Sequence, residues 1–323
     1  MHMNNMVYDT WAQEVPSGSG RRVVEKAPAA SIQPVDAHVH VWDLGRRPQP
    51  WIDPGTMSVL ARDFHPDELD SEMSSAGVSA GVLVQVLNDA AESDELMWAA
   101  AGPPFSGVVP WVDLLRADVE DQLDALSTHP SGAHLAGVRH QALAEPDPPG
   151  WLAKAGEGAA FGLLGRRGLA FDLLLGPGHL AAAYAVVETH PGTTFVLDHA
   201  GKPPVTSGWL SSASREWAAG VAALGQLPNT ACKLSGLTTL ADSSSWTVSD
   251  LSACADHVLS CFGPERVMFG SDWPVSLRAG SYARTVDSAR DLVAALSAEE
   301  QQAVLGRTAR RVYRLPEPVG ATS

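Results

Sequence analysis

A repeated alternation between short apolar runs and longer Ala/Leu/Glu-rich stretches constrains the fold of this chain more than any other feature. Such a rhythm is typical of βα units, and continuously apolar runs are expected of strands buried on both faces of a parallel sheet. Eight runs begin about 33 residues apart on average, which predicts an α/β fold, a single-domain (β/α)8 TIM barrel. The runs are 34–42, 81–86, 107–113, 137–141, 170–175, 194–201, 230–236 and 267–274.

The stretches between the runs place apolar residues at helical spacing, with Pro- and Gly-rich breakers such as 146–150 beside them. We therefore expect an N-terminal extension over 1–33, the barrel over 34–315 and a C-terminal tail over 316–323. The expected helices are 92–101, 117–126, 179–190, 215–224, 250–262 and 282–296, and 299–313 is expected to close the barrel.

Composition excludes several classes of protein. The 22 Lys and Arg against 37 Asp and Glu give a net charge of −15, which repels phosphate backbones and anionic membrane surfaces. Only 3 cysteines are present, too few and unpaired for a disulfide framework, and no stretch is apolar enough to span a membrane. We expect a cytoplasmic protein with a small-molecule partner, no nucleic-acid or membrane partner, and no oligomeric state that the sequence specifies.

Polar side chains gather where the predicted strands end, the side on which barrel enzymes build their sites. His38 and His40 project to one side of the first strand because side chains alternate, so they can share one ion or one carbonyl oxygen. His199 follows the sixth strand and Asp272 follows the eighth. As an alternative, Asp272 caps the next helix, and the histidines are ordinary core or loop residues. Together these four residues predict a catalytic site.

Further polar and aromatic residues at the strand ends and in the first loop are candidates for substrate binding. A guanidinium binds a carboxylate or sugar hydroxyls, an amide suits a hydroxyl, and a tryptophan stacks on a sugar face. Each also has a structural alternative, such as an ion pair or a loop anchor. The candidates are Arg139, His140, Gln85, Trp51, Lys202 and Trp273.

Lys233 lies inside the apolar seventh run, where an unpaired ammonium is costly to bury. We expect it to pair with a buried acid, for which Asp172, Asp198 and Asp113 are candidates. A structural ionic network is favoured over a direct catalytic role.

The ordered segments VDAHVH, GVLVQ, VPWVDL, GVRHQ, FDLLL, VLDHAGKP, CKLSGL and MFGSDWPV, over about 35–313, closely resemble the amidohydrolase superfamily. The similar branch contains sugar lactonases and pyrone-dicarboxylate hydrolases. The resemblance implies a TIM-barrel hydrolase that opens the ring ester of a sugar-derived aldonolactone. Asp272 would take the proton of the attacking water and return it to the leaving oxygen, while His38, His40 and His199 stabilise the oxyanion.

The departures from that family bear on metal binding. No lysine that would bridge two metals stands on the fourth strand, which ends in Arg139, His140 and Gln141, and the fifth run has no histidine. We expect at most one divalent ion. His38, His40, His199 and Asp272 would serve either without metal or as the ligands of one Zn²⁺, and no organic cofactor is expected.

Three alternatives stay open. A pyrone dicarboxylate needs several cations at the barrel mouth, whereas only Arg139 lies at a predicted strand end, so a polyhydroxylated lactone is favoured. A zinc-dependent decarboxylase shares the same strand-end residues and would release carbon dioxide. A non-catalytic binding barrel would have lost one of them.

Overall fold

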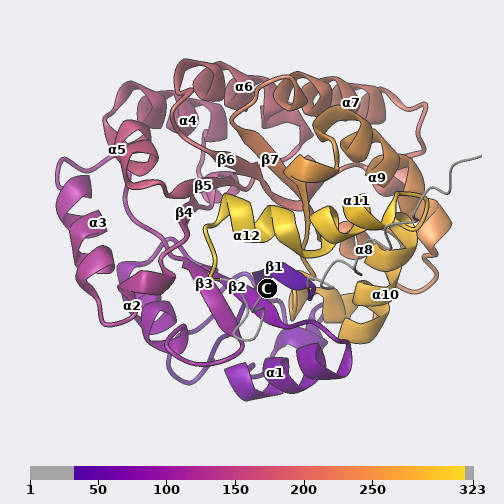
Figure 1. The fold of residues 1–323 in the computed structure, drawn as a ribbon, viewed down its shortest axis with the longest axis horizontal. Coiled ribbons are helices and arrows are strands. Elements are labelled where there is room, and N and C mark those ends of the chain that lie inside the picture. The colour runs from indigo at the N-terminus through magenta and orange to yellow at the C-terminus, as the bar shows by residue number, and fades with distance from the viewer. Residues whose placement is uncertain (1–32, 317–323) are drawn as a thin grey trace, which may run out of the picture. The chain divides into compact units, whose positions relative to one another are not determined.

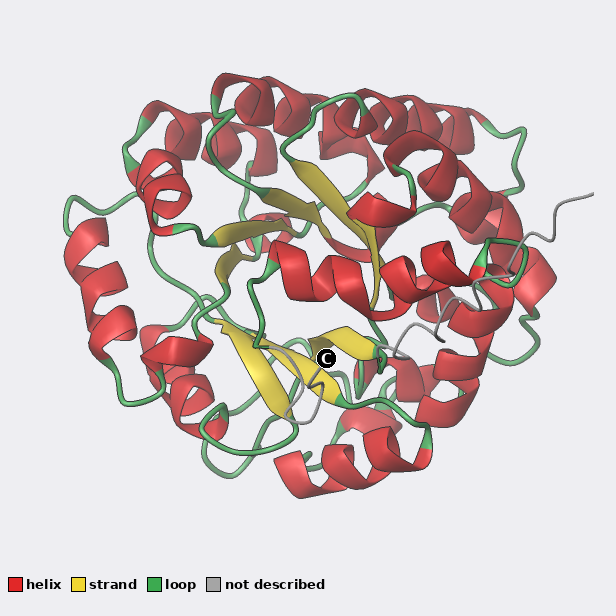
Figure 2. Cartoon of the chain, in the orientation of Figure 1, coloured by secondary structure: helices red, strands yellow, loops and turns green. Residues whose placement is uncertain are grey.

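The computed structural model describes residues 33–316, within the second of two units into which the chain divides, Met1–Ser31 and Ile32–Ser323. The expected extension 1–33 lies almost wholly outside the described residues, and the tail beyond 316 does so entirely. Parallel strands fill the centre of the second unit and helices surround them (Figures 1 and 2). The predicted TIM barrel is confirmed, with strands β1 Val35–Val39, β2 Ala80–Val84, β3 Phe105–Val109, β4 Gly137–His140, β5 Ala170–Leu173, β6 Phe195–Leu197, β7 Thr230–Leu234 and β8 Val267–Phe269.

Backbone hydrogen bonds just beyond the regular ladders close the barrel. Strands β1–β2–β3 form one parallel ladder and β4–β5–β6–β7–β8 form another. Between β3 and β4, Ala136 N donates to Val108 O at 2.9 Å. Between β8 and β1, Asp272 N donates to His38 O at 2.9 Å and His40 N to Trp273 O at 2.7 Å. The second seam thus fixes the backbone of both histidines against that of the aspartate.

The outer helices match most of the predicted ones, with four additions. The unpredicted helices are α1 Pro66–Ser75, α4 Pro148–Glu157, α5 Ala160–Arg167 and α8 Leu237–Leu240, and α4 was missed because we took the proline-rich segment 146–150 as a breaker. Proline is tolerated in the first turn of a helix, and the Asp147 carboxylate caps α4 by accepting from Gly150 N at 3.1 Å. The helices are α1 Pro66–Ser75, α2 Ala90–Ala99, α3 Val119–Thr128, α4 Pro148–Glu157, α5 Ala160–Arg167, α6 Leu180–Thr189, α7 Ser212–Gly225, α8 Leu237–Leu240, α9 Val248–Phe262 and α10 Tyr282–Leu292.

The C-terminal segment covers the N-terminal ends of the strands. It comprises α11 Ala298–Gln302, a π-helical turn over Ala303–Arg307 and α12 Thr308–Val312, and it crosses in front of the strands in Figure 1. Tyr313 and Leu315 join the small apolar residues of the barrel interior in one cluster. A Cβ on Gly107 of β3 would lie 2.6 Å from Leu315 Cδ2, so glycine makes room for this side chain.

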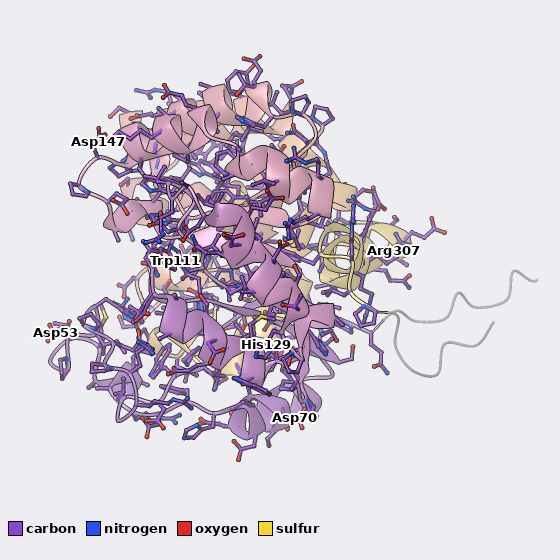
Figure 3. All side chains as sticks on the ribbon, turned by 90° about the vertical axis from the view of Figure 1, so that its left-hand side faces the viewer. Asp53, Asp70, Trp111, His129, Asp147 and Arg307 are labelled. Carbon is purple, nitrogen blue, oxygen red and sulfur yellow. The ribbon has the colours of Figure 1, made fainter. Side chains whose placement is uncertain are left out.

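The two ends of the barrel therefore differ. Asp53 and Asp147, in loops that follow β1 and β4, lie on one side of the barrel, and Arg307 of the C-terminal segment lies on the opposite side (Figure 3). Among helices within 33–316, none is both long and apolar enough to cross a membrane. The C-terminal segment closes one end of the barrel. The other end, where the strands have their C-terminal residues, is left open, and we call it the open end.

Glu92 in the first turn of α2 ties the end of β2 to its helix. The side chain is buried, and its Oε2 accepts from Val86 N at 2.9 Å and Leu87 N at 2.7 Å. Burial raises its pKa to about 7 from an ordinary value of 4.5, because the two amide donors offset only part of the desolvation.

We predict that Glu92→Gln gains stability relative to the wild type as pH rises. Below pH 4.5 the carboxyl is neutral in both folded and unfolded chains. Between pH 4.5 and about 7 the carboxyl ionises in the unfolded chain but stays protonated in the folded one. The free energy of unfolding of the wild type therefore falls by about 3 kcal/mol over this range, whereas that of Glu92→Gln does not. Urea unfolding from pH 4 to 8 measures the difference, and a difference that stays constant with pH contradicts the expectation.

Candidate functional site

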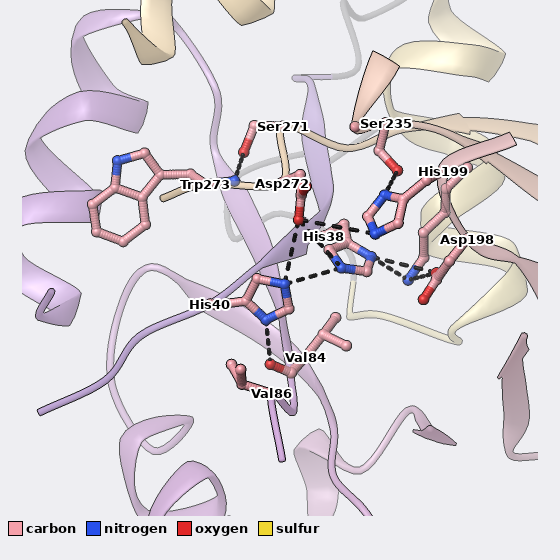
Figure 4. A network of polar contacts seen from close by, with 12 residues as sticks. His38, His40, Val84, Val86, Asp198, His199, Ser235, Ser271, Asp272 and Trp273 are labelled. Carbon is pink, nitrogen blue, oxygen red and sulfur yellow. Dashed lines mark hydrogen bonds and ion pairs between the residues drawn. The ribbon is translucent and has the colours of Figure 1, made fainter. Parts of the chain in front are cut away.

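Strand β1 delivers His38 and His40 into the open end of the barrel, where both are buried. Their Nε2 atoms lie 3.1 Å apart, and His40 Nδ1 lies 2.7 Å from Val84 O (Figure 4). Asp36, two residues before His38, fixes this end of the strand: its Oδ1 accepts from His38 N at 3.2 Å and from Ser271 N at 2.8 Å. The pair is therefore tied to the loop that carries Asp272.

A left-handed turn after β6 places His199 and Lys202. Positive φ values run through four successive residues, +52° at His199, +52° at Ala200, +69° at Gly201 and +55° at Lys202. L-residues adopt this conformation at a cost of roughly 1–2 kcal/mol each, so the surrounding structure must hold it. One holding contact is the buried Trp217, whose Nε1 donates to Ala200 O at 2.7 Å. The turn brings an imidazole and an ammonium into one cavity.

Asp272 also has a left-handed backbone, with φ of +60°. Its Oδ1 faces three imidazoles: it lies 3.4 Å from His40 Nε2, 3.8 Å from His38 Nε2 and 4.0 Å from His199 Nε2 (Figure 4). Burial raises the pKa of this carboxyl. The adjacent His199 and His40 lower it by a larger amount, so the pKa ends below the ordinary value of 3.8. Asp272 is thus an ionised carboxylate at neutral pH.

Two of the three catalytic histidines, His38 and His199, have lowered pKa values and are neutral at pH 7. Burial lowers the pKa of His199 to about 4, although nearby carboxylates act against it. Burial and then the charge of Lys233 hold the pKa of His38 well below the ordinary 6.5. The site thus combines one carboxylate able to accept a proton with neutral rings able to form hydrogen bonds.

Beneath the catalytic candidates lies a buried ionic network. Lys233 Nζ of β7 lies 2.6 Å from Asp172 Oδ2 and 2.9 Å from Asp198 Oδ1, which confirms the expected pairing, while Asp113 lies outside the network. Arg139 Nη1 of β4 donates to Asp198 Oδ2 at 3.0 Å. Tyr313 from the C-terminal segment donates to Asp172 at 2.7 Å. The network joins β4, β5, β6 and β7 to the far end of the barrel.

A cavity of about 210 Å³ opens above these groups. Six of the ten predicted catalytic and substrate-binding residues line it: His40, His199, Asp272, Arg139, Lys202 and Trp51. His38 lies directly beneath them. Lining residues that the sequence did not single out are Val86, Gln141, Leu174 and Val275.

His140 does not line the cavity. Its ring stacks on Trp151 at 3.8 Å, accepts from Trp111 Nε1 at 2.9 Å and lies 2.8 Å from Glu145 Oε1. Because side chains alternate along β4, Arg139 and its second neighbour Gln141 share the inner face and His140 takes the outer one. That alternation was the signal that would have selected Gln141.

Gln85 and Trp273 also serve the structure around the cavity. Gln85 is buried, and its backbone and side-chain oxygens both accept from Arg139 Nη2, the side-chain oxygen at 3.3 Å. Trp273 is fully buried and packs edge-on against Phe64 at 5.2 Å. Gln85 therefore orients the guanidinium, and Trp273 anchors the loop that follows Asp272.

The surroundings of His38 do not suit a metal ion. The spacing of three of the four expected ligands, His38, His40 and Asp272, would admit one ion, with 3.1 Å between His38 Nε2 and His40 Nε2. However, Lys233 Nζ lies 3.0 Å from His38 Nδ1, and Arg139 Nη1 lies 3.1 Å from His38 Nε2. Ammonium and guanidinium only donate, so an ion on His38 would meet two fixed positive charges. Zn²⁺ therefore does not fit His38 in this hydrogen-bonded arrangement.

A parallel barrel with histidines and an aspartate at the C-terminal ends of its strands is typical of TIM-barrel enzymes, which build their active sites at that end. The chain belongs to the amidohydrolase family, whose model matches residues 35–315.

Its relatives include L-fucono-1,5-lactonase of Burkholderia multivorans, 36% identical over 89% of this chain and 98% of that protein. Crystal structures of a Burkholderia multivorans amidohydrolase, one with bound HEPES and one with bound zinc, match with TM-score 0.81 and 34% identity over 88% of this chain and 100% of theirs. A putative 2-pyrone-4,6-dicarboxylic acid hydrolase of Pseudomonas putida, 22% identical over 88% of this chain and 98% of its own with TM-score 0.62, shows the shared fold alone.

Gly236 allows the His199 ring its position. At φ of +67°, a Cβ on Gly236 would lie 2.8 Å from His199 Nδ1. We predict that Gly236→Ala displaces the ring and lowers hydrolytic kcat/KM at least about tenfold, the loss that follows from a small misplacement of a reacting group.

Gly208→Ala is the matched control. Gly208 also has a positive φ, +77°, but a Cβ there meets no described atom within 4 Å. Gly208 has ψ of 144°, a conformation almost confined to glycine, whereas Gly236 has ψ of 0°, so Gly208→Ala should lose at least as much stability in thermal unfolding, and only Gly236→Ala should lose activity. Equal losses of activity would show that strain, and not the position of the ring, matters.

Proposed function

We propose that this protein hydrolyses the ring ester of a monosaccharide-derived aldonolactone, with L-fucono-1,5-lactone as the first substrate to test. The observation that carries the proposal is the convergence of the Asp272 carboxylate and three imidazoles, within 4.0 Å of one oxygen, on one small cavity. The name of the 36% identical relative supports the choice of substrate. A role in cytoplasmic carbohydrate metabolism belongs to the same proposal.

The residues divide the reaction between them. Asp272 takes a proton from a water molecule, whose oxygen adds to the lactone carbonyl carbon. Hydrogen-bond donors from the histidines stabilise the oxyanion that forms. The ring C–O bond then breaks, and Asp272 returns its proton to the departing alkoxide. Atoms and charge balance without a serine nucleophile or an external cofactor.

The walls of the cavity favour a neutral sugar ring. Its 210 Å³ is small beside the roughly 300–1,000 Å³ of sites for larger ligands, which suits a single ring. Trp51 offers an aromatic wall, and Gln141 and Lys202 offer polar groups toward sugar hydroxyls. These are the features of a monosaccharide subsite.

The charges at the cavity argue against a dicarboxylate. Arg139 is neutralised by Asp198 at 3.0 Å and held by Gln85. Lys202 forms no ion pair with a residue of the described part of the chain. Of the two basic side chains that line the cavity, Arg139 and Lys202, it is therefore the one whose charge is available to a ligand. Two carboxylates would therefore share one available cation beside the Asp272 carboxylate. A pyrone dicarboxylate is the less favoured substrate for this reason.

A substrate panel tests the proposal. Acid release should follow addition of L-fucono-1,5-lactone or L-rhamnono-lactone, and 2-pyrone-4,6-dicarboxylate should turn over at least about 100-fold more slowly, the cost of an unpaired buried charge. Turnover of the dicarboxylate alone would overturn the assignment to sugar lactones. Release of carbon dioxide instead of acid would replace hydrolysis by decarboxylation.

We further predict that Asp272→Asn lowers kcat on the preferred lactone by about 10²–10⁴-fold, the usual contribution of a general base. KM should change little, because the amide keeps the shape of the side chain. Steady-state kinetics with a melting curve for each protein measures both effects. Wild-type kcat in the folded variant would remove Asp272 from the chemistry.

A further inference from the structure

The cavity above the catalytic residues has an apolar wall that takes no part in the proposed proton transfers. Trp51 in the loop after β1, Val86 after β2 and Val275 after β8 line it, and all three pack into one apolar cluster. Strands β8, β1 and β2 are neighbours in the barrel, so these side chains lie on one side of the cavity. In Figure 4, Val86 lies on the side of His40, away from His199.

The side-chain N–H of Trp51 and the backbone of Val86 are already hydrogen bonded. Trp51 Nε1 donates to Gln49 Oε1 at 2.9 Å. Val86 N donates to Glu92 Oε2 at 2.9 Å, and Val86 O accepts from Gln141 Nε2. A ligand hydroxyl that points at this wall would lose its water and meet aliphatic carbon in return, whereas a methyl group would gain from burial.

The other side of the cavity is polar. Arg139 of β4, Gln141 after β4 and Lys202 after β6 line it, with Leu174 after β5 between them. Gln141 uses one amide N–H on Val86 O, which leaves Oε1 and the second N–H for a ligand. In an eight-stranded barrel β4 faces β8 and β6 faces β2. A sugar lactone with hydroxyls on one edge and a carbon substituent on the other would therefore bind in one orientation.

The proposed reaction determines which edge of the lactone meets the apolar wall. Asp272 must reach the ring oxygen to return its proton. In a 1,5-lactone that oxygen is bonded to C5, the carbon that also carries the exocyclic group. The chain turns tightly after Asp272, where Ser276 N donates to Asp272 O at 2.9 Å, and this turn keeps Val275 beside the catalytic carboxylate. The exocyclic group therefore falls against Val275.

We propose that Val275 is a specificity-determining residue, which forms with Val86 and Trp51 a subsite for an apolar substituent on C5 of the lactone. The site then selects a methyl group over a hydroxymethyl group by about 10–100-fold, the range that a hydrophobic pocket reaches against an added hydroxyl. A hydroxyl placed there either lacks a partner or bonds to Asp272, which occupies the carboxylate that the attacking water needs. This inference rests on the proposed lactone hydrolysis and names the part of the substrate that the site distinguishes.

Two lactones that differ in this group alone provide the first test. L-fucono-1,5-lactone carries a methyl group on C5, and L-galactono-1,5-lactone carries a hydroxymethyl group there, with the same configuration at every ring carbon. We expect wild-type kcat/KM to be at least about tenfold higher for the methyl compound. Equal values, with both compounds hydrolysed, would overturn the subsite.

A nearly isosteric variant tests the role of Val275. Val275→Thr places a hydroxyl in the wall that can bond to the hydroxymethyl group. The ratio of kcat/KM for the methyl compound to that for the hydroxymethyl compound should therefore fall about tenfold, the effect of one hydrogen bond. Val41→Thr is the matched control, because Val41 is partly buried in the same apolar cluster and does not line this cavity. It should keep the wild-type ratio.

The outcomes separate this inference from the proposed function. A folded Val275→Thr protein with the wild-type ratio would overturn the role of Val275, and so would an equal change in Val41→Thr. Should Val275→Thr fail to fold, Val275→Ala replaces it: loss of the buried methyl contact should lower the ratio at least about fourfold, and an unchanged ratio would contradict the proposal. Hydrolysis of neither lactone by the wild type would instead reject the proposed function, and the subsite with it.

Discussion

The buried ammonium of Lys233 is the interaction on which the rest of the site depends. A charge with no exposure to water is tolerated only when it is fully paired, and Lys233 obtains its partners from Asp172 on β5, Asp198 after β6 and His38 on β1. These three strands must therefore hold one register. Asp198 in turn neutralises Arg139, so the placement of the cavity's guanidinium follows from the same pairing.

Backbone strain at the open end is held by a rigid scaffold. His199, Ala200, Lys202 and Asp272 all adopt positive φ, although the flanking strands are regular. Fully buried Trp217 and Trp273 anchor the two strained loops from the apolar side. Strain of this kind persists where the surroundings overdetermine it, which is why imidazole and carboxylate converge at this end of the barrel.

The sequence carried most of the fold and the catalytic centre, because both depend on short-range rules. Strand periodicity located all eight strands, and strand ends located His38, His40, His199 and Asp272. His140 was placed on the wrong face because the alternation used for the first strand was not applied to the fourth. Helix α4 was missed because the prolines that begin it were taken to break a helix. The left-handed turn after β6 depends on tertiary contacts that no local pattern encodes.

A crystal structure of Asp272→Asn with an aldonolactone, or of the wild type with the corresponding hydroxy acid, tests the central claim most directly. One carbonyl or carboxylate oxygen should lie within hydrogen-bond distance of the Nε2 atom of His40 or His199, with the sugar ring against Trp51 and the side chain of residue 272 beside the ring oxygen or its hydroxyl product. A ligand whose carboxyl group rests on Lys202 alone, away from the histidines, would contradict the claim that the histidines and Asp272 open the ester.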